Sequence, residues 1–234
     1  MDPTRPFPAV PPAIAARYDA AFREVRSGFF RWSILSVNDT NSLVDAISPA
    51  RFAVDERLPY WADLWCSSVT LAGDLRARPA MAGMRVLELG CGLGLAGIAA
   101  AQAGGAVTMT DYEEDALLFA RCNVQANLTL EEQTRVKIMP MDWRTTGGDA
   151  TYDLVIGADI VYERVNFPPI LSLLRRAVRP GGVALIADPD RSLGRDFLRE
   201  AGENGFHVTS RRSREEHGGR TTNVVISELK APAS

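Results

Sequence analysis

Glycines recur at every second position directly after an apolar run that has the character of a buried strand. The run that begins at Met84 leads into the sequence LELGCGLGLAG, which contains Glu88, Gly90, Gly92 and Gly94. A strand followed by a glycine loop that opens a helix is a common way of holding a nucleotide cofactor, because backbone N–H groups can approach the ligand closely. The loop is therefore the first candidate for a binding site.

The same letters fit two cofactor patterns, and the position of the strand end decides between them. Read from Gly92, GLGLAG matches the GxGxxG of dinucleotide oxidoreductases, in which the first glycine turns directly off the strand. That reading places the turn two residues late and leaves Gly90 without a role, and a reading from Gly90 puts Leu95 where the third glycine belongs. Read from Glu88 as ExGxGxG, the glycines permit close backbone approach, Glu88 can meet an ammonium group, and Gly97 lets the helix pack closely on the sheet. S-adenosyl-L-methionine (SAM), a ligand with an amino-acid end and no pyrophosphate, suits this second reading, and an NAD(P) oxidoreductase remains the alternative.

Acidic residues also follow the next two predicted strands. Asp111 comes about twenty residues after the loop, where a carboxylate can accept hydrogen bonds from two ribose hydroxyls, and Tyr112 beside it can cover an adenine face. Asp142 follows the third strand and can accept from the adenine amino group, with Trp143 next to it. A helix cap and a solvated turn are the structural alternatives for Asp111 and Asp142. Acids at the ends of three successive strands favour a single cofactor site.

The elements that would position these residues alternate regularly along the chain. Strands are expected at 84–89, 107–110, 136–139, 153–156 and 182–187, and helices at 65–76, 95–103, 113–126, 167–178 and 193–204. Such alternation predicts right-handed βαβ units and a parallel sheet. Two last strands, at 206–211 and 222–229, have no helix between them, so one of them breaks the parallel pattern. The expected fold is α/β, with a doubly wound, mostly parallel seven-strand sheet whose last strand is antiparallel.

The first 58 residues precede this alternation. Residues 1–12 carry five prolines and are expected to form a flexible tail. Residues 13–58 are expected to form a short α/β extension. In it, the spacing of Ile14, Tyr18, Phe22 and Val25 predicts a helix over 13–25, residues 29–37 read as a strand, and residues 43–47 as a short hairpin partner. Residues 59–234 then form the main domain.

Four stretches, in this order and spacing, carry a resemblance to a known family. LELGCGLGLAG, TDYEEDALLFARCNVQANL, MDW and GADIVY look like the class I, seven-strand, Rossmann-like SAM-dependent methyltransferases, over residues 59–186. They are most similar to the branch with a DxxY motif, which includes protein-lysine methyltransferases of chaperones, elongation factors and electron-transfer flavoprotein. The upstream PYWADLW resembles the tryptophan-bearing lead-in of that branch.

The resemblance implies a site for SAM and a site for an acceptor amine. The cofactor contacts that it implies come from Trp65, Glu88, Gly90, Asp111, Trp143 and Ala158. The DxxY motif falls on Asp159, which we expect to orient the amine, and on Tyr162, which we expect to line its channel or accept a hydrogen bond. A turn-capping Asp159 and a packing Tyr162 are the structural alternative. DIVY lacks both prolines of the N/DPPY motif of adenine and glutamine methyltransferases, and DPDR at 188–191 resembles the flavoprotein-directed members only in part.

Composition narrows the classes of function. The net charge of −3 provides no basic field for nucleic acid or an anionic membrane. No signal peptide is recognisable, and no apolar run reaches the roughly 18 residues of a membrane span. His207 and His217 are the only histidines and stand apart from acidic or cysteine clusters, so no metal site is expected. Three scattered cysteines without a CxxC favour a reducing compartment, and we expect a cytoplasmic protein.

These observations together predict a SAM-dependent N-methyltransferase whose acceptor is a lysine side chain of a protein. A small-molecule amine is the alternative acceptor. A non-catalytic SAM-binding protein that has kept the pocket is the alternative from another functional class. No nucleic acid, membrane or metal partner is expected.

Overall fold

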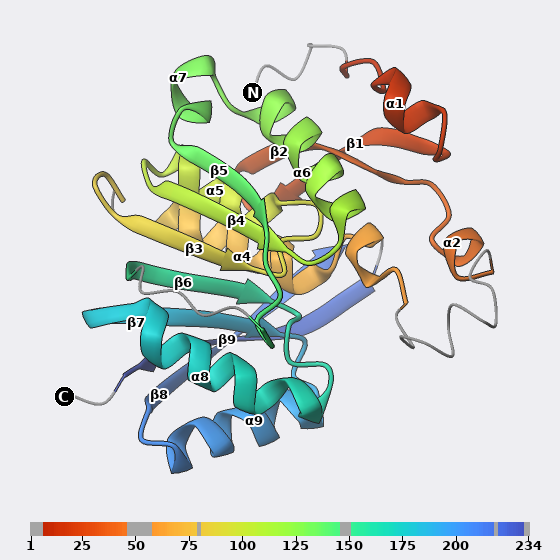
Figure 1. The fold of residues 1–234 in the computed structure, drawn as a ribbon. Coiled ribbons are helices and arrows are strands. Elements are labelled where there is room, and N and C mark those ends of the chain that lie inside the picture. Colours follow the sequence, from red (N-terminus) through yellow and green to blue (C-terminus); the bar gives the residue numbers. More distant parts are fainter. Residues whose placement is uncertain (1–6, 46–57, 79–80, 146–150, 218–219, 232–234) are drawn as a thin grey trace.

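A seven-stranded sheet runs through the middle of the molecule in the computed structural model, which describes residues 7–45, 58–78, 81–145, 151–217 and 220–231 (Figure 1). Its strand order is β5-β4-β3-β6-β7-β9-β8. The strands are β3 (Arg85–Leu89), β4 (Ala106–Asp111), β5 (Val136–Pro140), β6 (Tyr152–Ala158), β7 (Val178–Asp188), β8 (His207–His217) and β9 (Arg220–Lys230). Neighbouring strands pair in parallel except at β9, which is antiparallel to both β7 and β8. The predicted mostly parallel sheet with an antiparallel last strand is confirmed.

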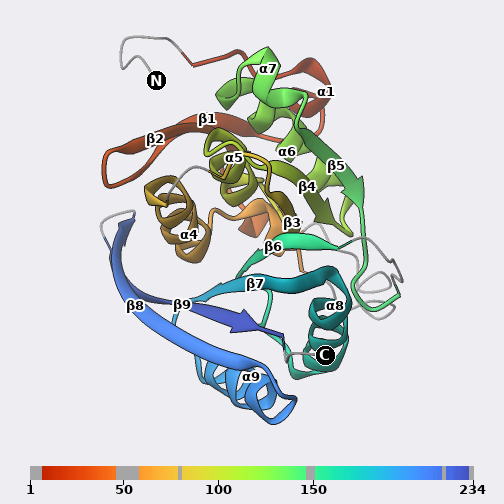
Figure 2. The same cartoon turned by 90° about the vertical axis from the view of Figure 1, so that its left-hand side faces the viewer.

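Helices cover both faces of this sheet. Figure 2 shows α4 (Cys66–Ala77), α5 (Leu95–Gln102) and α6 (Glu114–Asn127) on one face, and α8 (Phe167–Ala177) and α9 (Ser192–Glu203) on the other. Successive side chains of a strand point to opposite faces, so Val86 lies in the core under α4–α6 and Leu87 in the core under α8 and α9. The shorter elements are η1 (Tyr60–Ala62), α7 (Leu130–Gln133) and η2 (Arg164–Asn166). Among the helices of the described residues, none has the length and apolar character that crossing a membrane requires.

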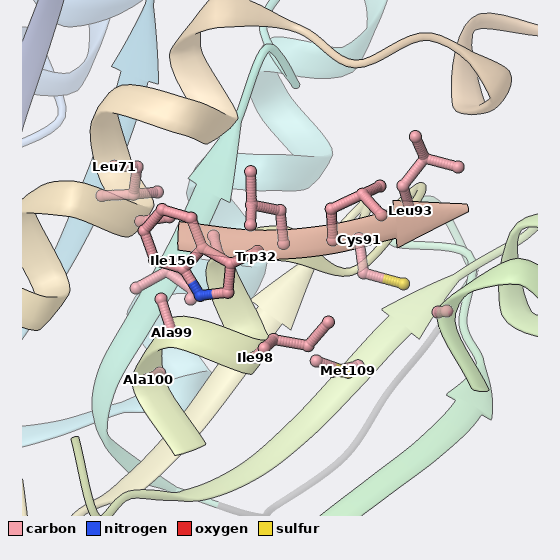
Figure 3. Packing of buried hydrophobic residues seen from close by; sticks show 14 of the residues in the cluster. Trp32, Leu71, Cys91, Leu93, Ile98, Ala99, Ala100, Met109 and Ile156 are labelled. Atoms are coloured by element: carbon pink, nitrogen blue, oxygen red, sulfur yellow. The ribbon is translucent and has the colours of Figure 1, made fainter. Parts of the chain in front are cut away.

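Helix α5 is buried along almost its whole circumference. Its sequence LAGIAAAQ leaves only Gln102 partly exposed, and an all-round apolar helix is stable only when other elements surround it. The sheet covers one side, and Trp32 of the N-terminal hairpin belongs to the same core. Figure 3 shows Trp32 with Leu71, Ala99 and other members of this core. The Trp32 indole N–H donates to Gln102 Oε1 at 3.0 Å, which satisfies the polar atom of a fully buried ring.

The N-terminal residues form a hairpin instead of the predicted long helix. α1 spans only Pro12–Ala15, and β1 (Ala20–Ser27) pairs antiparallel with β2 (Phe30–Val37), so the helix predicted over 13–25 is wrong beyond residue 15. The predicted strand over 29–37 is confirmed as β2. A two-residue loop with Gly28 at φ 54° joins the strands, a position that favours glycine. Residues 20–27 form a strand despite their helical spacing, because they pair with β2. Without this pairing the backbone N–H and C=O groups of both strands would be left unpaired.

Residues 43–45, the described part of the predicted hairpin partner of β2, are helical. A short helix, α2, spans Asn41–Asp45, and residues 46 and 47 lie outside the described part of the chain. The Asn41 N–H donates to Asp39 Oδ1 at 3.0 Å, and the Thr40 carbonyl accepts from Leu43 and Val44. These local hydrogen bonds close a helical turn, as short polar side chains commonly do.

The hairpin is fastened to α6 by two asparagines one helical turn apart. Asn123 accepts the Leu35 N–H at 2.6 Å and donates to the Leu35 carbonyl at 3.2 Å. Asn127 does the same with Ser33, at 2.8 and 2.7 Å. The two amides therefore bond the backbone of β2 much as a neighbouring strand would.

Candidate functional site

A cavity of about 370 Å³ lies at the carboxyl ends of β3, β4 and β6. Its volume is within the range typical of small-molecule sites. The chain runs from β3 to β4 and β5 on one side of the sheet and then crosses to β6, on the other side of β3. The strand order therefore reverses between β3 and β6. Open α/β sheets bind their ligands at such a switch point. The glycine loop, Asp111 and Asp159 all line the cavity.

The glycine loop has the backbone that only glycine adopts easily. Gly90, Gly92 and Gly94 have φ values of 60°, 50° and 81°. A Cβ at Gly90 would lie 3.0 Å from Ile160 Cγ2, and one at Gly92 would lie 3.2 Å from a backbone oxygen. Gly94 is the N-cap of α5, so the loop ends directly in a helix N-terminus. The ExGxGxG register is thus the one in which each glycine has a structural requirement.

Glu88 lies beneath this loop and is only 4% exposed. Its Oε2 atom has no hydrogen-bond partner among the described residues, and the residue belongs to the cavity lining. Burial raises the pKa of the Glu88 carboxyl to about 8, against the effect of the Gly97 backbone N–H. A Cβ at Gly97 would collide with Glu88 and with Met109, so the predicted close approach of α5 to the sheet is confirmed.

Asp111 connects the end of β4 to the glycine loop. Its Oδ2 accepts the Gly92 N–H at 2.9 Å and its Oδ1 accepts the Glu113 N–H at 3.0 Å. Burial raises the pKa of Asp111, and these backbone N–H groups oppose that rise. The carboxylate thus orders the loop and also faces the cavity, where the neighbouring Tyr112 ring lies as well. Asp111 is not the cap of α6, because the N-cap residue of that helix is Glu113.

Asp142 and Trp143 face different surroundings although they are adjacent. The Asp142 carboxylate accepts from Arg144 Nη2 at 2.6 Å and from the Arg144 backbone N–H at 2.9 Å, and it does not belong to the cavity lining. Trp143 does line the cavity and donates from Nε1 to Asn166 Oδ1 at 3.3 Å. The ring therefore lies at the site, whereas the carboxylate beside it is engaged at the edge.

Asp159 follows β6 in a left-handed turn. Its φ is 57°, and its N–H donates to the Ala187 carbonyl at 2.9 Å. The residue is 8% exposed. Arg191 Nη2 lies 2.8 Å from Asp159 Oδ1. Burial raises the pKa of Asp159 to about 6, while Arg191 and Ser67 lower it and Asp188 raises it further. The carboxylate is therefore mostly ionised at neutral pH despite its burial.

Three aromatic rings, Tyr60, Trp65 and Tyr162, form an aromatic wall beside Asp159. The Tyr60 ring centroid lies 5.3 Å from that of Tyr162 and 6.1 Å from that of Trp65. The Trp65 Nε1 donates to the Tyr60 carbonyl at 2.8 Å. Burial raises the pKa of Tyr162 to about 12, so its hydroxyl stays protonated at neutral pH. Trp61, which lies in η1, also lines the cavity.

The cavity gathers eleven of the twelve predicted site residues, all except Asp142. Sequence reasoning did not assign six polar lining residues, which are Tyr60, Asp63, Ser68, Glu113, Glu163 and Arg191. Tyr60 and Asp63 lie in PYWADLW, Glu113 lies in TDYEEDALLFARCNVQANL, and Arg191 ends DPDR. Those stretches carried a signal, whereas nothing marked Ser68 or Glu163. Burial raises the pKa of the Cys91 thiol in the loop well above its usual value, as suits an unreactive filler. The described residues contain no group of three or more metal-ligating side chains.

Comparisons with known proteins agree with this geometry. A sequence model of the family described as "Lysine methyltransferase" matches residues 62–204. Protein N-lysine methyltransferase METTL21A of Danio rerio is 37% identical over 56% of this chain and 62% of its own length. EEF1A lysine methyltransferase 3 of Mus musculus is 34% identical over 65% of this chain and 66% of its own. The chain thus spans slightly less than two thirds of either relative.

A solved structure shares the fold at low sequence identity. It is the glycopeptide N-methyltransferase MtfA in complex with SAM, with a TM-score of 0.59, 15% identity, and coverage of 80% of this chain and 98% of that one. At this identity the likeness concerns the fold. The seven-strand sheet of this chain therefore has the same Rossmann-like fold as that protein.

Proposed function

The chain belongs to the lysine methyltransferase family, and from that premise we propose that it transfers a methyl group from SAM to a lysine side chain of a protein. One observation carries the proposal. A single cavity brings the glycine loop, Asp111 and Trp143 together with Asp159 and the aromatic wall. The residues proposed to bind the cofactor and those proposed to bind the amine therefore line one continuous cavity.

The residues of the cavity fit SAM, the cofactor of this family. The unpartnered Oε2 of Glu88 suits the ammonium of the methionine end, because a buried carboxylate oxygen needs a donor. Gly90 and Gly92 line the cavity without a side chain, which leaves backbone surface next to the ligand. Asp111 at the end of β4 suits the ribose hydroxyls, and Tyr112 and Trp143 suit the adenine faces. We propose Trp65, Gly94 and Ala158 as further cofactor contacts, and Asp142 as an outer residue that keeps Arg144 in place.

The chain's own groups then have to present a neutral amine in line with the methyl group. Bound SAM supplies an electrophilic methyl on a sulfonium, so the protein mainly positions the reactants. A lysine ammonium has a reference pKa of about 10.4 and must lose a proton before it attacks. We propose that Asp159 orients the amine by accepting its hydrogen bond and that the aromatic wall lines the channel. With its pKa at about 12, the Tyr162 hydroxyl does not act as a base at neutral pH, so we propose that it lines the channel or accepts a hydrogen bond.

We also propose the arrangement of the whole chain and its setting. Residues 59–234 would form the methyltransferase domain, with residues 13–58 as an extension held on α6 and residues 1–12 as a tail. The three cysteines are all free thiols in the structure, which supports a cytoplasmic location. The net charge of −3 supports a protein partner instead of a nucleic acid or a membrane.

The test is incubation of the enzyme with tritiated SAM and a lysate of the source organism lacking the gene. The proposal expects a labelled protein band that yields methyl-lysine on hydrolysis. Label confined to the small-molecule fraction would favour a small amine, and no label with retained SAM binding would favour a non-catalytic protein. Asp159→Asn should lower band labelling about 100-fold or more while its calorimetric affinity for the demethylated cofactor stays within about threefold. Asp190→Asn is the matched control, because Asp190 also has a positive φ of 56° and lies outside the cavity.

A further inference from the structure

A carboxylate–arginine cluster of Asp159, Asp188 and Arg191 closes one side of the acceptor region. Arg191 Nη2 lies 2.8 Å from Asp159 Oδ1, and Arg191 Nη1 lies 3.7 Å from Asp188 Oδ2. Different nitrogens of the same guanidinium therefore face the two carboxylates. Asp159 and Asp188 are 8% and 5% exposed. Arg191, whose side chain is 31% exposed, is the member that reaches the cavity surface most openly.

The cluster joins the ends of two neighbouring strands to the start of a helix. Asp159 follows β6, Asp188 ends β7, and Arg191 is the N-cap of α9. The Arg191 backbone N–H donates to Asp188 Oδ1 at 2.7 Å, which fixes the turn from which its side chain reaches back to Asp159. A Cβ at Gly194 would collide with the Asp188 carboxylate, so the first turn of α9 lies directly against it. This arrangement directs the guanidinium to the space between the two carboxylates.

The cluster has one cation for two buried carboxylates. Burying a net charge is unfavourable unless a further partner compensates it. Asp188 Oδ2 makes no hydrogen bond within the described residues. The guanidinium also lies over the Trp65 ring, 5.6 Å from its centroid, so it forms part of the aromatic side of the cavity. An ammonium that enters beside Asp159 would balance the charge of the cluster, and a lysine side chain carries such a group.

We propose that Arg191 is a positioning residue for methyl transfer, which bridges Asp159 and Asp188 and keeps the Asp159 carboxylate turned and charged to receive the substrate amine. The inference rests on the proposed function and deepens it. Arg191 orients Asp159 by direct contact, and Asp188 acts as the second anchor of the same guanidinium. A substrate ammonium shares Asp159 with Arg191, and the guanidinium then shifts its contact toward Asp188 Oδ2, which has an acceptor position open.

The two partners of Asp159 act on its charge in opposite directions, which makes the inference testable. Arg191 lowers the pKa of Asp159 and Asp188 raises it. From α4, Ser67 lowers that pKa too, and the Cys66 thiol faces Asp159 closely enough for its own pKa to be raised by the carboxylate. Removing Arg191 should therefore make Asp159 ionise at higher pH, and removing the charge of Asp188 should make it ionise at lower pH. General damage to the fold would lower activity without moving the two variants apart in pH.

The experiment measures tritium transfer from SAM to the labelled lysate band between pH 5 and 9. For Arg191→Gln we expect the acid limb of the rate profile to move to higher pH by about one unit or more, with labelling at pH 7 reduced about twofold or more and largely recovered at pH 9. Asp188→Asn should move the same limb to lower pH, because asparagine keeps the acceptor for the Arg191 N–H but loses the charge. Arg191→Lys should fall between wild type and Arg191→Gln, since a point charge cannot bridge both carboxylates. Arg199→Gln is the control, because Arg199 also lies in α9 but pairs with Asp196 at 3.0 Å and does not line the cavity.

Two further outcomes separate this inference from the proposed function. If wild type labels the band and neither Arg191→Gln nor Asp188→Asn moves the acid limb, the positioning role is refuted while the methyltransferase stands. If wild type labels no protein, the proposed function fails and this inference falls with it. Calorimetry with the demethylated cofactor checks folding of each variant, and we expect affinities within about twofold of wild type. Should Arg191→Gln not fold, the opposite limb shifts of Arg191→Lys and Asp188→Asn decide the question.

Discussion

Replacing Glu88 by glutamine should stabilise the SAM-free protein in a pH-dependent way. Burial raises the pKa of the Glu88 carboxyl to about 8 from an ordinary value of 4.5. Between these values the unfolded chain has released the proton and the native protein still holds it, so wild type loses stability as pH rises. Each pH unit in that window costs about 1.4 kcal/mol. The loss is below about 1 kcal/mol at pH 5 and reaches about 3 kcal/mol at pH 7, and a glutamine avoids it at every pH.

Urea unfolding followed by circular dichroism at pH 5, 6, 7 and 8 measures this difference. The free energy of unfolding of Glu88→Gln minus that of wild type should grow across the series, whatever constant offset the amide adds through its own hydrogen bonds. Glu131→Gln serves as control, because that side chain is 90% exposed, and it should show no such growth. The same substitution should weaken SAM binding, because the cofactor ammonium loses its carboxylate. A difference that stays flat from pH 5 to 8 would refute the reasoning that burial keeps Glu88 protonated.

Three further substitutions probe the cavity. Asp111→Asn should lower the affinity for the demethylated cofactor roughly 10- to 100-fold by calorimetry, since bonds to a charged acceptor contribute about 1.5–3 kcal/mol; an unchanged affinity would contradict its place at the ribose. Gly90→Ala should lower the free energy of unfolding by about 1–3 kcal/mol, because φ is 60° and Ile160 leaves no room; thermal unfolding like that of wild type would contradict this. Tyr162→Phe should keep the pH–rate profile between pH 7 and 9, because the hydroxyl stays protonated there, whereas Tyr162→Ala should raise the KM for the protein substrate by removing the ring next to Tyr60. A profile altered by Tyr162→Phe would show that the hydroxyl takes part in the proton transfer.

Sequence reasoning succeeded best at positions where the backbone conformation permits few residue types. The positive φ at Gly90, Gly92 and Gly94 leaves few alternatives to glycine, so the spacing predicts both the loop and the strand before it. The alternation of strands and helices predicts the sheet, because parallel strands require crossovers of about this length. The position of Asp111 follows from the same alternation. It ends the strand that pairs in parallel with β3, so it must lie beside the glycine loop.

Sequence reasoning failed where the partner of a segment is distant in the chain. Phe22 and Val25 fit a helical spacing, but the pairing of β1 with β2 decides their conformation, and only Gly28 signalled the turn between them. Arg191 went unassigned because its role depends on Asp159, which lies 32 positions earlier and meets it only across two strand ends. Asp142 is a different case, because its partner is near in the chain: the side chain of Arg144, two residues on, donates to its carboxylate.

Asn123 gives the N-terminal hairpin a connection to the glycine loop. Besides its two bonds to Leu35, its Nδ2 donates to the carbonyl of Leu93 at 2.9 Å. One buried amide therefore satisfies a strand of the extension and the loop between Gly92 and Gly94 at once. We therefore expect that a substitution which loosens the hairpin also makes the loop easier to disorder, because the two share this amide. The hairpin thus takes part in the energetics of the loop although it contributes no side chain to the cavity lining.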